Sequence, residues 1–276
     1  MSTISRPTRF RATSRSLAPV GATLVAAVTG ALLTASPAQA ADGAGMSASW
    51  KYYQSDAFQV AATLPGVKLT AFGSDQNGSR NLYGSIEHVA NDGRCSRVVI
   101  RAINVSSDLV DETTCGNGTY KTFNTGSGSF DDGLLVLVYR TIPGTTNADK
   151  SLFVGIPSSA NDAGVRTTGT GASWSYYTAT DYTYSLVRPG VRLTGYGSDG
   201  SSRSTINTVE KTATGSGCAS ASVKAGDVST SGSTCTSSTA GYFARWDLDG
   251  GLNVKACYKP TSAAEACLST YLPKPV

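Results

Sequence analysis

Apolar and polar residues alternate over short stretches of the chain, as expected of β-strands that bury one face. Residues 67–71 read Val-Lys-Leu-Thr-Ala, and residues 191–195 read Val-Arg-Leu-Thr-Gly. Arg97–Val105 and Leu134–Arg140 are rich in β-branched residues and are flanked by Gly, Asn and Asp, which are typical of turns. These stretches predict an all-β chain.

Turn signals separate the predicted strands. Pro65-Gly66 and Pro189-Gly190 predict tight turns, because proline fixes φ and glycine permits a positive φ. Beyond residue 40 no stretch keeps a helical period over three turns, and only residues 262–267 are expected to form one short helical turn.

The sequence contains an internal repeat with an offset of 124 residues. Residues 48–75 and 172–199 are identical at 13 of 28 positions without a gap. The repeat predicts two homologous tandem domains, 48–157 and 172–276, each of ordinary domain size. The Ser/Thr/Gly-rich segment 158–171 is expected to be an exposed linker.

Each copy is expected to be a small β-domain held by disulfides. With roughly seven short strands and regular turn signals, a copy fits a β-sandwich or a small barrel. Six cysteines in an exported chain point to three bonds, and the chain has no C-x-x-C motif. The alignment of the two copies predicts the pairs Cys95–Cys115 and Cys218–Cys235, and it leaves Cys257–Cys267 as a bond unique to the second copy.

The first 40 residues resemble a secretory signal peptide. They contain four arginines and no acidic residue, an apolar run from Leu17 to Leu33, and Ala38-Gln39-Ala40 as an A-x-A cleavage site. The expected location of the mature chain is therefore extracellular. Residues 41–47, rich in Gly, Ala and Ser, are expected to be a flexible tail in which Met46 could anchor a partner.

Charge and hydropathy limit the class of partner. The whole chain carries 23 basic and 19 acidic residues, but the four leader arginines account for the excess. A nucleic-acid partner is not expected, because phosphate binding needs a clustered excess of Lys and Arg. Apart from the apolar run of the leader, the sequence has no apolar stretch long enough to predict a membrane span. No cofactor is expected.

Residue types that carry catalysis are scarce. His88 is the single histidine, and it lies in a predicted strand that has no histidine in the second copy. The sequence therefore offers no clear histidine base for a hydrolase of the Ser-His-Asp kind, and no enzymatic activity is expected. The carboxylate pairs Asp131-Asp132 and Asp247/Asp249 precede glycine and an apolar stretch, which favours hairpin turns.

Two loops combine acidic residues, glycine and arginine, 75–80 and 199–203. Neither has the series of oxygen ligands and the closing carboxylate of a calcium loop. Asp75–Arg80 and Asp199–Arg203 are instead expected to be weak surface ion pairs.

An aromatic group opens each copy, Trp-Lys-Tyr-Tyr at 50–53 and Trp-Ser-Tyr-Tyr at 174–177. The tryptophans are expected to fill the domain cores. Tyrosine on an exposed face stacks on sugar rings or anchors a protein partner. The candidate partner-binding residues are Tyr52, Tyr53, Tyr176 and Tyr177, together with Met46.

These features together resemble the adaptor subunit of the umbrella toxin particles exported by actinobacteria. The resemblance rests on the leader, the duplicated disulfide-bonded β-module beginning Ala-Ser-Trp-x-Tyr-Tyr, and the lack of a catalytic motif. It implies a bridge between a lectin subunit and a large toxin-bearing stalk subunit. Other readings of the residues are a carbohydrate- or cell-wall-binding module and a secreted enzyme inhibitor.

Overall fold

The computed structural model describes residues 45–76, 79–103, 105, 107–130, 133–157, 166–199, 203–236 and 251–272, and the backbone alone of 239–246. The strands of the first half are β1 Ser47–Gln54, β2 Ala57–Leu64, β3 Val67–Gln76, β4 Ser79–His88, β5 Cys95–Ala102, β6 Asp108–Cys115, β7 Thr119–Asn124, β8 Gly133–Thr141 and β9 Ala148–Pro157. Those of the second half are β10 Gly171–Tyr176, β11 Asp181–Arg188, β12 Val191–Asp199, β13 Arg203–Lys211, β14 Gly217–Ala225, β15 Val228–Thr234, β16 Thr239–Trp246, β17 Leu252–Pro260 and β18 Ala266–Leu272.

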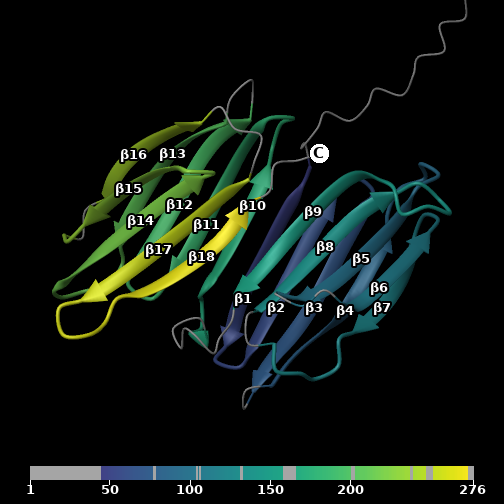
Figure 1. Cartoon of the computed structure of the whole chain (residues 1–276), viewed down its shortest axis with the longest axis horizontal. Helices are drawn as coiled ribbons and strands as arrows, with labels where there is room; N and C mark the ends of the chain where they lie inside the picture. Colours follow the sequence, from purple (N-terminus) through teal and green to yellow (C-terminus); the bar gives the residue numbers. More distant parts are fainter. Residues whose placement is uncertain are drawn as a thin grey trace, which may run out of the picture. The chain divides into compact units, whose positions relative to one another are not determined.

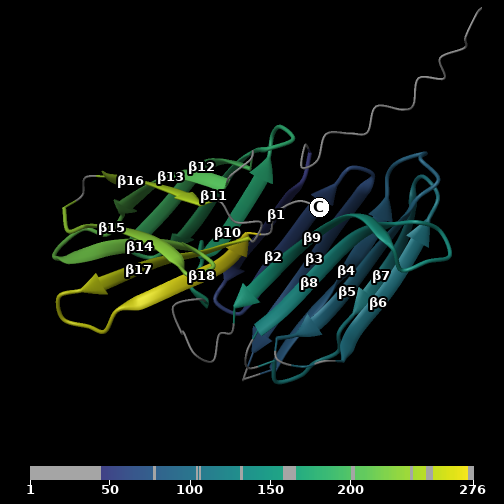
Figure 2. The same cartoon turned by 45° about the horizontal axis from the view of Figure 1, so that its top comes forward.

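The two halves share one large sheet, in the order β16-β13-β12-β11-β10-β1-β2-β3-β4-β7. The first small sheet, β6-β5-β8-β9, and the second small sheet, β15-β14-β17-β18, lie over one face of it (Figures 1 and 2). Each half is thus a two-layer sandwich. The all-β prediction is confirmed, and the sheets of the described chain are open rather than closed into a barrel.

A pseudo-two-fold axis relates the halves across the junction of β1 and β10. These strands pair antiparallel, and Ser49 lies opposite Ser173, its own equivalent in the repeat. Trp50 pairs with Ala172 and Ala48 pairs with Trp174, which are symmetry-related contacts. The junction therefore has the isologous geometry of a two-fold dimer, although it lies within one chain.

The core lies between the layers, where every second residue of each strand is buried. Its composition differs between the halves. Val60 in the first half corresponds to Tyr184 in the second, and Ala71, which pairs with Val60, corresponds to Gly195. The Tyr184 ring occupies the place where a side chain on Gly195 would lie, so a larger residue on one strand is accompanied by a smaller one on its neighbour.

All three predicted disulfides are confirmed. Cys95–Cys115, Cys218–Cys235 and Cys257–Cys267 are bonded. The two Pro-Gly turns also form, with φ of 82° at Gly66 and 89° at Gly190. The expected helical turn near residues 262–267 does not form, because the chain there makes a hairpin turn and enters β18.

The segments at the edges of the predicted domains differ from expectation. Met46 is buried, and its carbonyl accepts a hydrogen bond from the Tyr176 amide, so the end of the tail extends β1 along β10. Thr170, at the end of the predicted linker, is also buried and accepts from the Tyr52 amide. Backbone pairing orders the described end of each segment, at Met46 and at Thr170. Residues 1–44 and 158–165 lie outside the described part, and with them the leader prediction.

Candidate functional site

Three of the five candidate partner-binding residues are core residues. Met46, Tyr52 and Tyr176 lie on the inner face of the ten-stranded sheet and are 0–3% exposed. Tyr53 and Tyr177 are exposed, at 45% and 49%. Strand alternation explains the split, because adjacent tyrosines must point to opposite faces. Of the five candidates, only Tyr53 and Tyr177 therefore lie on the surface.

A buried Tyr–Asp–Arg network holds Tyr52 in place. The Tyr52 hydroxyl donates to Asp75 Oδ2 at 2.8 Å, and Arg80 Nη2 lies 2.7 Å from the same oxygen. Arg80 Nη1 donates to the Pro157 carbonyl of β9 at 3.0 Å, which links the two layers. The expected weak surface ion pair is wrong here, because both side chains are 3% exposed.

The second half repeats the network. Tyr176 donates to Asp199, Arg203 Nε lies 2.7 Å from Asp199 Oδ1, and Arg203 Nη1 donates to the Leu272 carbonyl at 3.3 Å. Burial raises the pKa of the Tyr52 and Tyr176 hydroxyls well above the usual range of tyrosine. Both carboxylates are engaged by arginine, so they are not arranged as calcium ligands. The networks instead join the layers.

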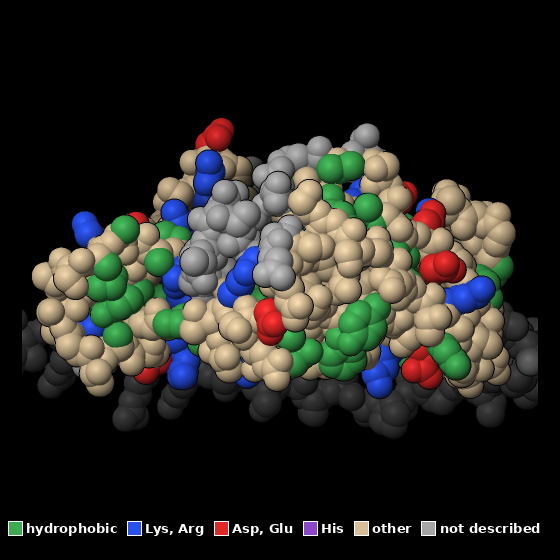
Figure 3. All heavy atoms as spheres, turned by 90° about the horizontal axis from the view of Figure 1, so that it is seen from below, with side chains coloured by type: hydrophobic (Ala, Val, Ile, Leu, Met, Phe, Trp, Pro, Cys, Tyr) green, Lys and Arg blue, Asp and Glu red, His purple; other side chains and the backbone are tan. Residues whose placement is uncertain are grey.

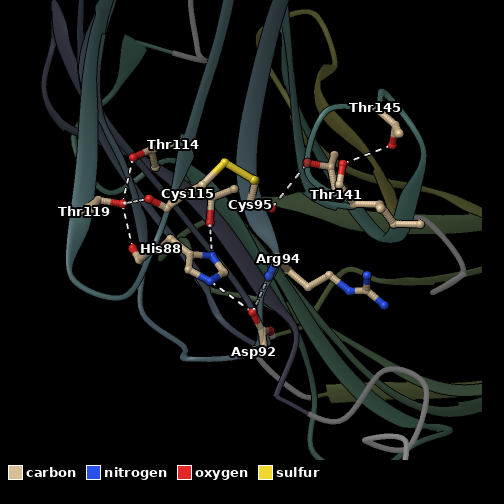
Figure 4. Close-up of a disulfide and its surroundings, with 12 residues drawn as sticks. His88, Asp92, Arg94, Cys95, Thr114, Cys115, Thr119, Thr141 and Thr145 are labelled. Carbon is tan, nitrogen blue, oxygen red and sulfur yellow. Dashed lines mark hydrogen bonds and ion pairs between the residues drawn. A yellow bond between two sulfur atoms is a disulfide. The ribbon is translucent and has the colours of Figure 1, made fainter.

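His88 lies between a serine and an aspartate, beside the Cys95–Cys115 bond (Figure 4). Its Nδ1 is 2.9 Å from Ser96 Oγ, and its Nε2 is 3.1 Å from Asp92 Oδ1. With Nε2–H donating to the carboxylate, Nδ1 accepts from the serine hydroxyl. These are the residue types of a hydrolytic triad, although sequence reasoning did not join them.

The burial of this cluster favours a structural role. Both His88 and Ser96 are 0% exposed, so a substrate has no route to the hydroxyl in this structure. The repeat places Lys211 at the position of His88, facing Val191 as His88 faces Val67. Lys211 Nζ donates to the Gly215 and Cys235 carbonyls. In both halves this position ties the end of a strand to the neighbouring disulfide hairpin.

Other candidate ligands form no metal site in the part of the chain that can be described. Cys257, Glu265 and Cys267 lie close together, but both sulfurs are in a disulfide, so one carboxylate remains. The carboxylate pairs Asp131-Asp132 and Asp247/Asp249 lie outside the described residues.

The outer face of the ten-stranded sheet carries two aromatic patches. Phe72 and Tyr83 form the first aromatic patch, with ring centroids 6.2 Å apart. Tyr177, Tyr196 and Ile206 form the second aromatic patch, in which the two tyrosine rings stack at 6.0 Å. All five side chains are 36–56% exposed.

The patches occupy equivalent positions. Phe72 corresponds to Tyr196, and the cross-strand pair Phe72–Tyr83 corresponds to Tyr196–Ile206. Sequence reasoning missed them, although the signal was present. Phe72 has the alternation parity of Lys68 and Thr70, which predicts an outward side chain.

Between the aromatic patches lies a shallow trough along β1 and β10. It consists of two grooves of about 530 Å³ and 350 Å³, lined mostly by serines, threonines, alanines and glycines, with Trp50, Trp174 and Tyr184 among the larger lining residues. Ser49 and Ser173, which flank the pseudo-two-fold axis, line both grooves. We call this surface the serine trough. Among the described side chains that line it, Lys51 alone is charged.

The outer faces of the two small sheets differ sharply from each other. Across the first runs the row Asp111-Val99-Leu137-Phe153, and at the same register across the second runs Ser231-Ser222-Lys255-Ser269. Leu135 and Tyr139 extend the apolar surface of the first sheet, and their equivalents are Asn253 and Cys257. We call these surfaces the apolar outer face and the serine outer face.

Ion pairs border the apolar outer face. Arg97 makes two hydrogen bonds to Asp111, at 2.7 and 2.5 Å, and Arg101 pairs with Asp108. Hydrogen bonding from Arg97 lowers the pKa of the Asp111 carboxyl. A half-buried apolar centre with a charged rim is the usual anatomy of a protein interface.

Charges elsewhere are mixed. On the face seen in Figure 3, hydrophobic patches are separated, and basic and acidic side chains are interspersed. In the described residues no helix is long and apolar enough to cross a membrane. No protein-family model matches the chain, and no curated protein matches its sequence.

Proposed function

We propose that this protein is a secreted, non-catalytic adaptor that binds two different protein partners, one through each half. The observation that carries the proposal is the contrast between the apolar outer face and the serine outer face. The same fold is built twice, so its folding requirements are the same in both halves. Leu135 and Leu137 are therefore not required by the fold, since Asn253 and Lys255 occupy the same positions in the second half. Phe153 does not enter this argument, because its ring stacks on Tyr271 of β18 with the centroids 5.1 Å apart.

The contrast suits a bridge rather than a symmetric binder. Two identical faces would recruit the same partner twice, whereas an apolar face and a polar face select different ones. The ladder between β1 and β10 holds both faces on one rigid sheet. Binding one partner then raises the effective concentration of the complex for the other.

The resemblance to the umbrella toxin adaptors supplies a setting for this proposal. In that setting the partners are a lectin-like subunit and a large toxin-bearing subunit, and the complex is extracellular. Three disulfides support an oxidising compartment. The leader sequence supports export of the chain from the cell.

Exchange of residues between the halves tests the proposal. The double variant Leu135→Asn, Leu137→Lys installs the residues of the second half in the first, so it is expected to fold. It should weaken capture of one partner at least about tenfold and leave the other unchanged. Native mass measurement of complexes from secreted material reads out both.

The reverse exchange is the matched control. Lys255→Leu should leave the first partner bound and weaken the second. If both exchanges leave both partners bound, the outer faces of the small sheets have no adaptor role.

A further inference from the structure

The ten-stranded sheet carries a second binding surface, on the face turned away from the small sheets. Five large apolar side chains lie there, exposed and outside the core, and four of them, Phe72, Tyr83, Tyr196 and Ile206, occupy equivalent positions of the two halves. Folding does not explain them, because outward positions of the same strands are otherwise polar, as at Lys68 and Thr194. Exposed cross-strand pairs of large apolar side chains at equivalent outward positions point to a ligand.

The spacing of the patches indicates an extended ligand. The first aromatic patch lies on β3 and β4, and the second reaches β12 and β13. Five interstrand spacings separate β3 from β12 in the sheet order, or about 24 Å. A ligand touching both patches must cross the strands and pass over Ser49 and Ser173 at the pseudo-two-fold axis.

The surface between the patches indicates an uncharged ligand. The larger groove of the serine trough is lined by no ionised side chain, and the smaller by Lys51 alone. Serine and threonine hydroxyls each offer one donor and two acceptors. This surface is complementary to a neutral molecule rich in hydroxyl groups. It provides neither the basic field that a nucleic acid requires nor the charged rim found on the first small sheet.

We infer that the outer face of the ten-stranded sheet binds an extended neutral polysaccharide of β-1,4-linked pyranose units. Each sugar ring has an apolar C–H face that packs on Phe72, Tyr83 or Tyr196, and hydroxyls around its edge that meet the serine trough. The aromatic patches then hold two parts of one chain. This site does not depend on the adaptor role, which uses the small sheets.

Retention on insoluble cellulose and on chitin tests the inference. Comparing the two shows whether the bound sugar carries an acetamido group, which chitin has and cellulose lacks. The probe is the secreted full chain. The double variant Phe72→Ala, Tyr196→Ala should weaken retention at least about tenfold, because one stacking contact is lost at each end. Ser173→Glu places a charge at the axis and should weaken retention similarly.

Tyr120→Ala is the matched control, since Tyr120 is 67% exposed on the edge strand β7 and belongs to neither patch. It should leave retention unchanged. Unfolding midpoints equal to the parent's will show that all variants are folded.

No retention on either glycan overturns the inference, as does retention that the variants leave unchanged. Loss of a protein partner in the Phe72/Tyr196 variant, with glycan retention intact, overturns it too and makes this face a protein interface.

Discussion

At the residue scale, the two Tyr–Asp–Arg networks are clusters of buried charged groups, in which Asp75, Arg80 and Arg203 are each 2% exposed. Each one places a charge pair, a phenol and a backbone carbonyl of the opposite layer within hydrogen-bonding distance. A buried pair of this kind is costly to break because the remaining partner is left unsolvated.

Removing one carboxylate therefore tests the networks. Asp75→Ala should lower the free energy of unfolding by about 3–5 kcal/mol, since Arg80 would be buried without its counter-ion. Glu210→Ala removes one partner of the exposed Arg192–Glu210 pair and should change the free energy of unfolding by less than about 0.5 kcal/mol. Urea titration of both variants is the measurement. Equal effects would mean that burial of the Asp75 pair is irrelevant to stability.

Tyr182 makes stability depend on pH in the alkaline range. Burial raises its pKa from 10.0 to about 12, so between these values the unfolded chain releases a proton that the folded chain retains. Its contribution is fully present below pH 10 and is lost as the pH rises toward 12. Tyr182→Phe, which copies Phe58 of the first half, should reduce this loss.

The measurement is urea unfolding of the parent protein and of Tyr182→Phe, each at about pH 7 and about pH 11. No free cysteine is present to start disulfide exchange at high pH. An unchanged alkaline loss in Tyr182→Phe would assign the effect to other groups.

At the element scale, the strand pattern was predictable where alternation was followed to the end of the strand. Asp75 shares the parity of Val67 and Leu69, which places it inside, but its neighbours Gly78 and Arg80 favoured a surface loop. Met46 has the parity of Ala48 and Trp50, and it is buried with them. Composition suggested a surface loop for Asp75 and a flexible tail for Met46, whereas the alternation of the strand predicts the buried face for both.

Long-range pairing could not be predicted in the same way. The repeat fixed the disulfides, because equivalent cysteines must close equivalent hairpins. It gave no information on which strand edges would meet, so the β1–β10 junction and the shared sheet were not anticipated. Edge pairing depends on backbone groups, which are the same in every strand.

The Cys257–Cys267 bond closes the β17–β18 hairpin, and its equivalents in the first half are Tyr139 and Ser151. The first half shows that this hairpin forms without a bond. Cys257→Ser, Cys267→Ser should therefore keep the fold and lower the free energy of unfolding by about 3 kcal/mol. Circular dichroism and urea titration check both parts. Loss of the β-signal at room temperature would contradict this expectation.

At the scale of the whole molecule, the shared sheet couples the two halves. The β1–β10 ladder, with Met46 and Thr170 at its ends, makes the backbone pairing of each half depend on the other. Independent modules on a linker would have no such dependence.

Calorimetry distinguishes the two cases. The described sheet predicts one cooperative transition, and Asp75→Ala in the first half should lower the midpoint of the whole transition. Two transitions, of which only one shifts, would show that the halves unfold separately.

The signal-peptide-like sequence of residues 1–40 predicts a defined mature end. Cleavage after Ala40 should give secreted protein that begins Ala41-Asp42-Gly43, as N-terminal sequencing can check. The released leader carries the four excess arginines, so the mature chain should also focus at a lower pI than the full chain. A leader still present on secreted material would contradict the prediction.

The register at Ser49 and Ser173 is the geometry by which two identical copies of the first half would pair with each other. In such a homodimer one gene encodes both faces, and every substitution appears twice. Tandem fusion removes that constraint, because a change at Leu137 no longer imposes the same change at the position of Lys255. The pairing strands have two-fold symmetry while the outer faces of the small sheets differ, so joining the two copies in one chain allows its two ends to be different.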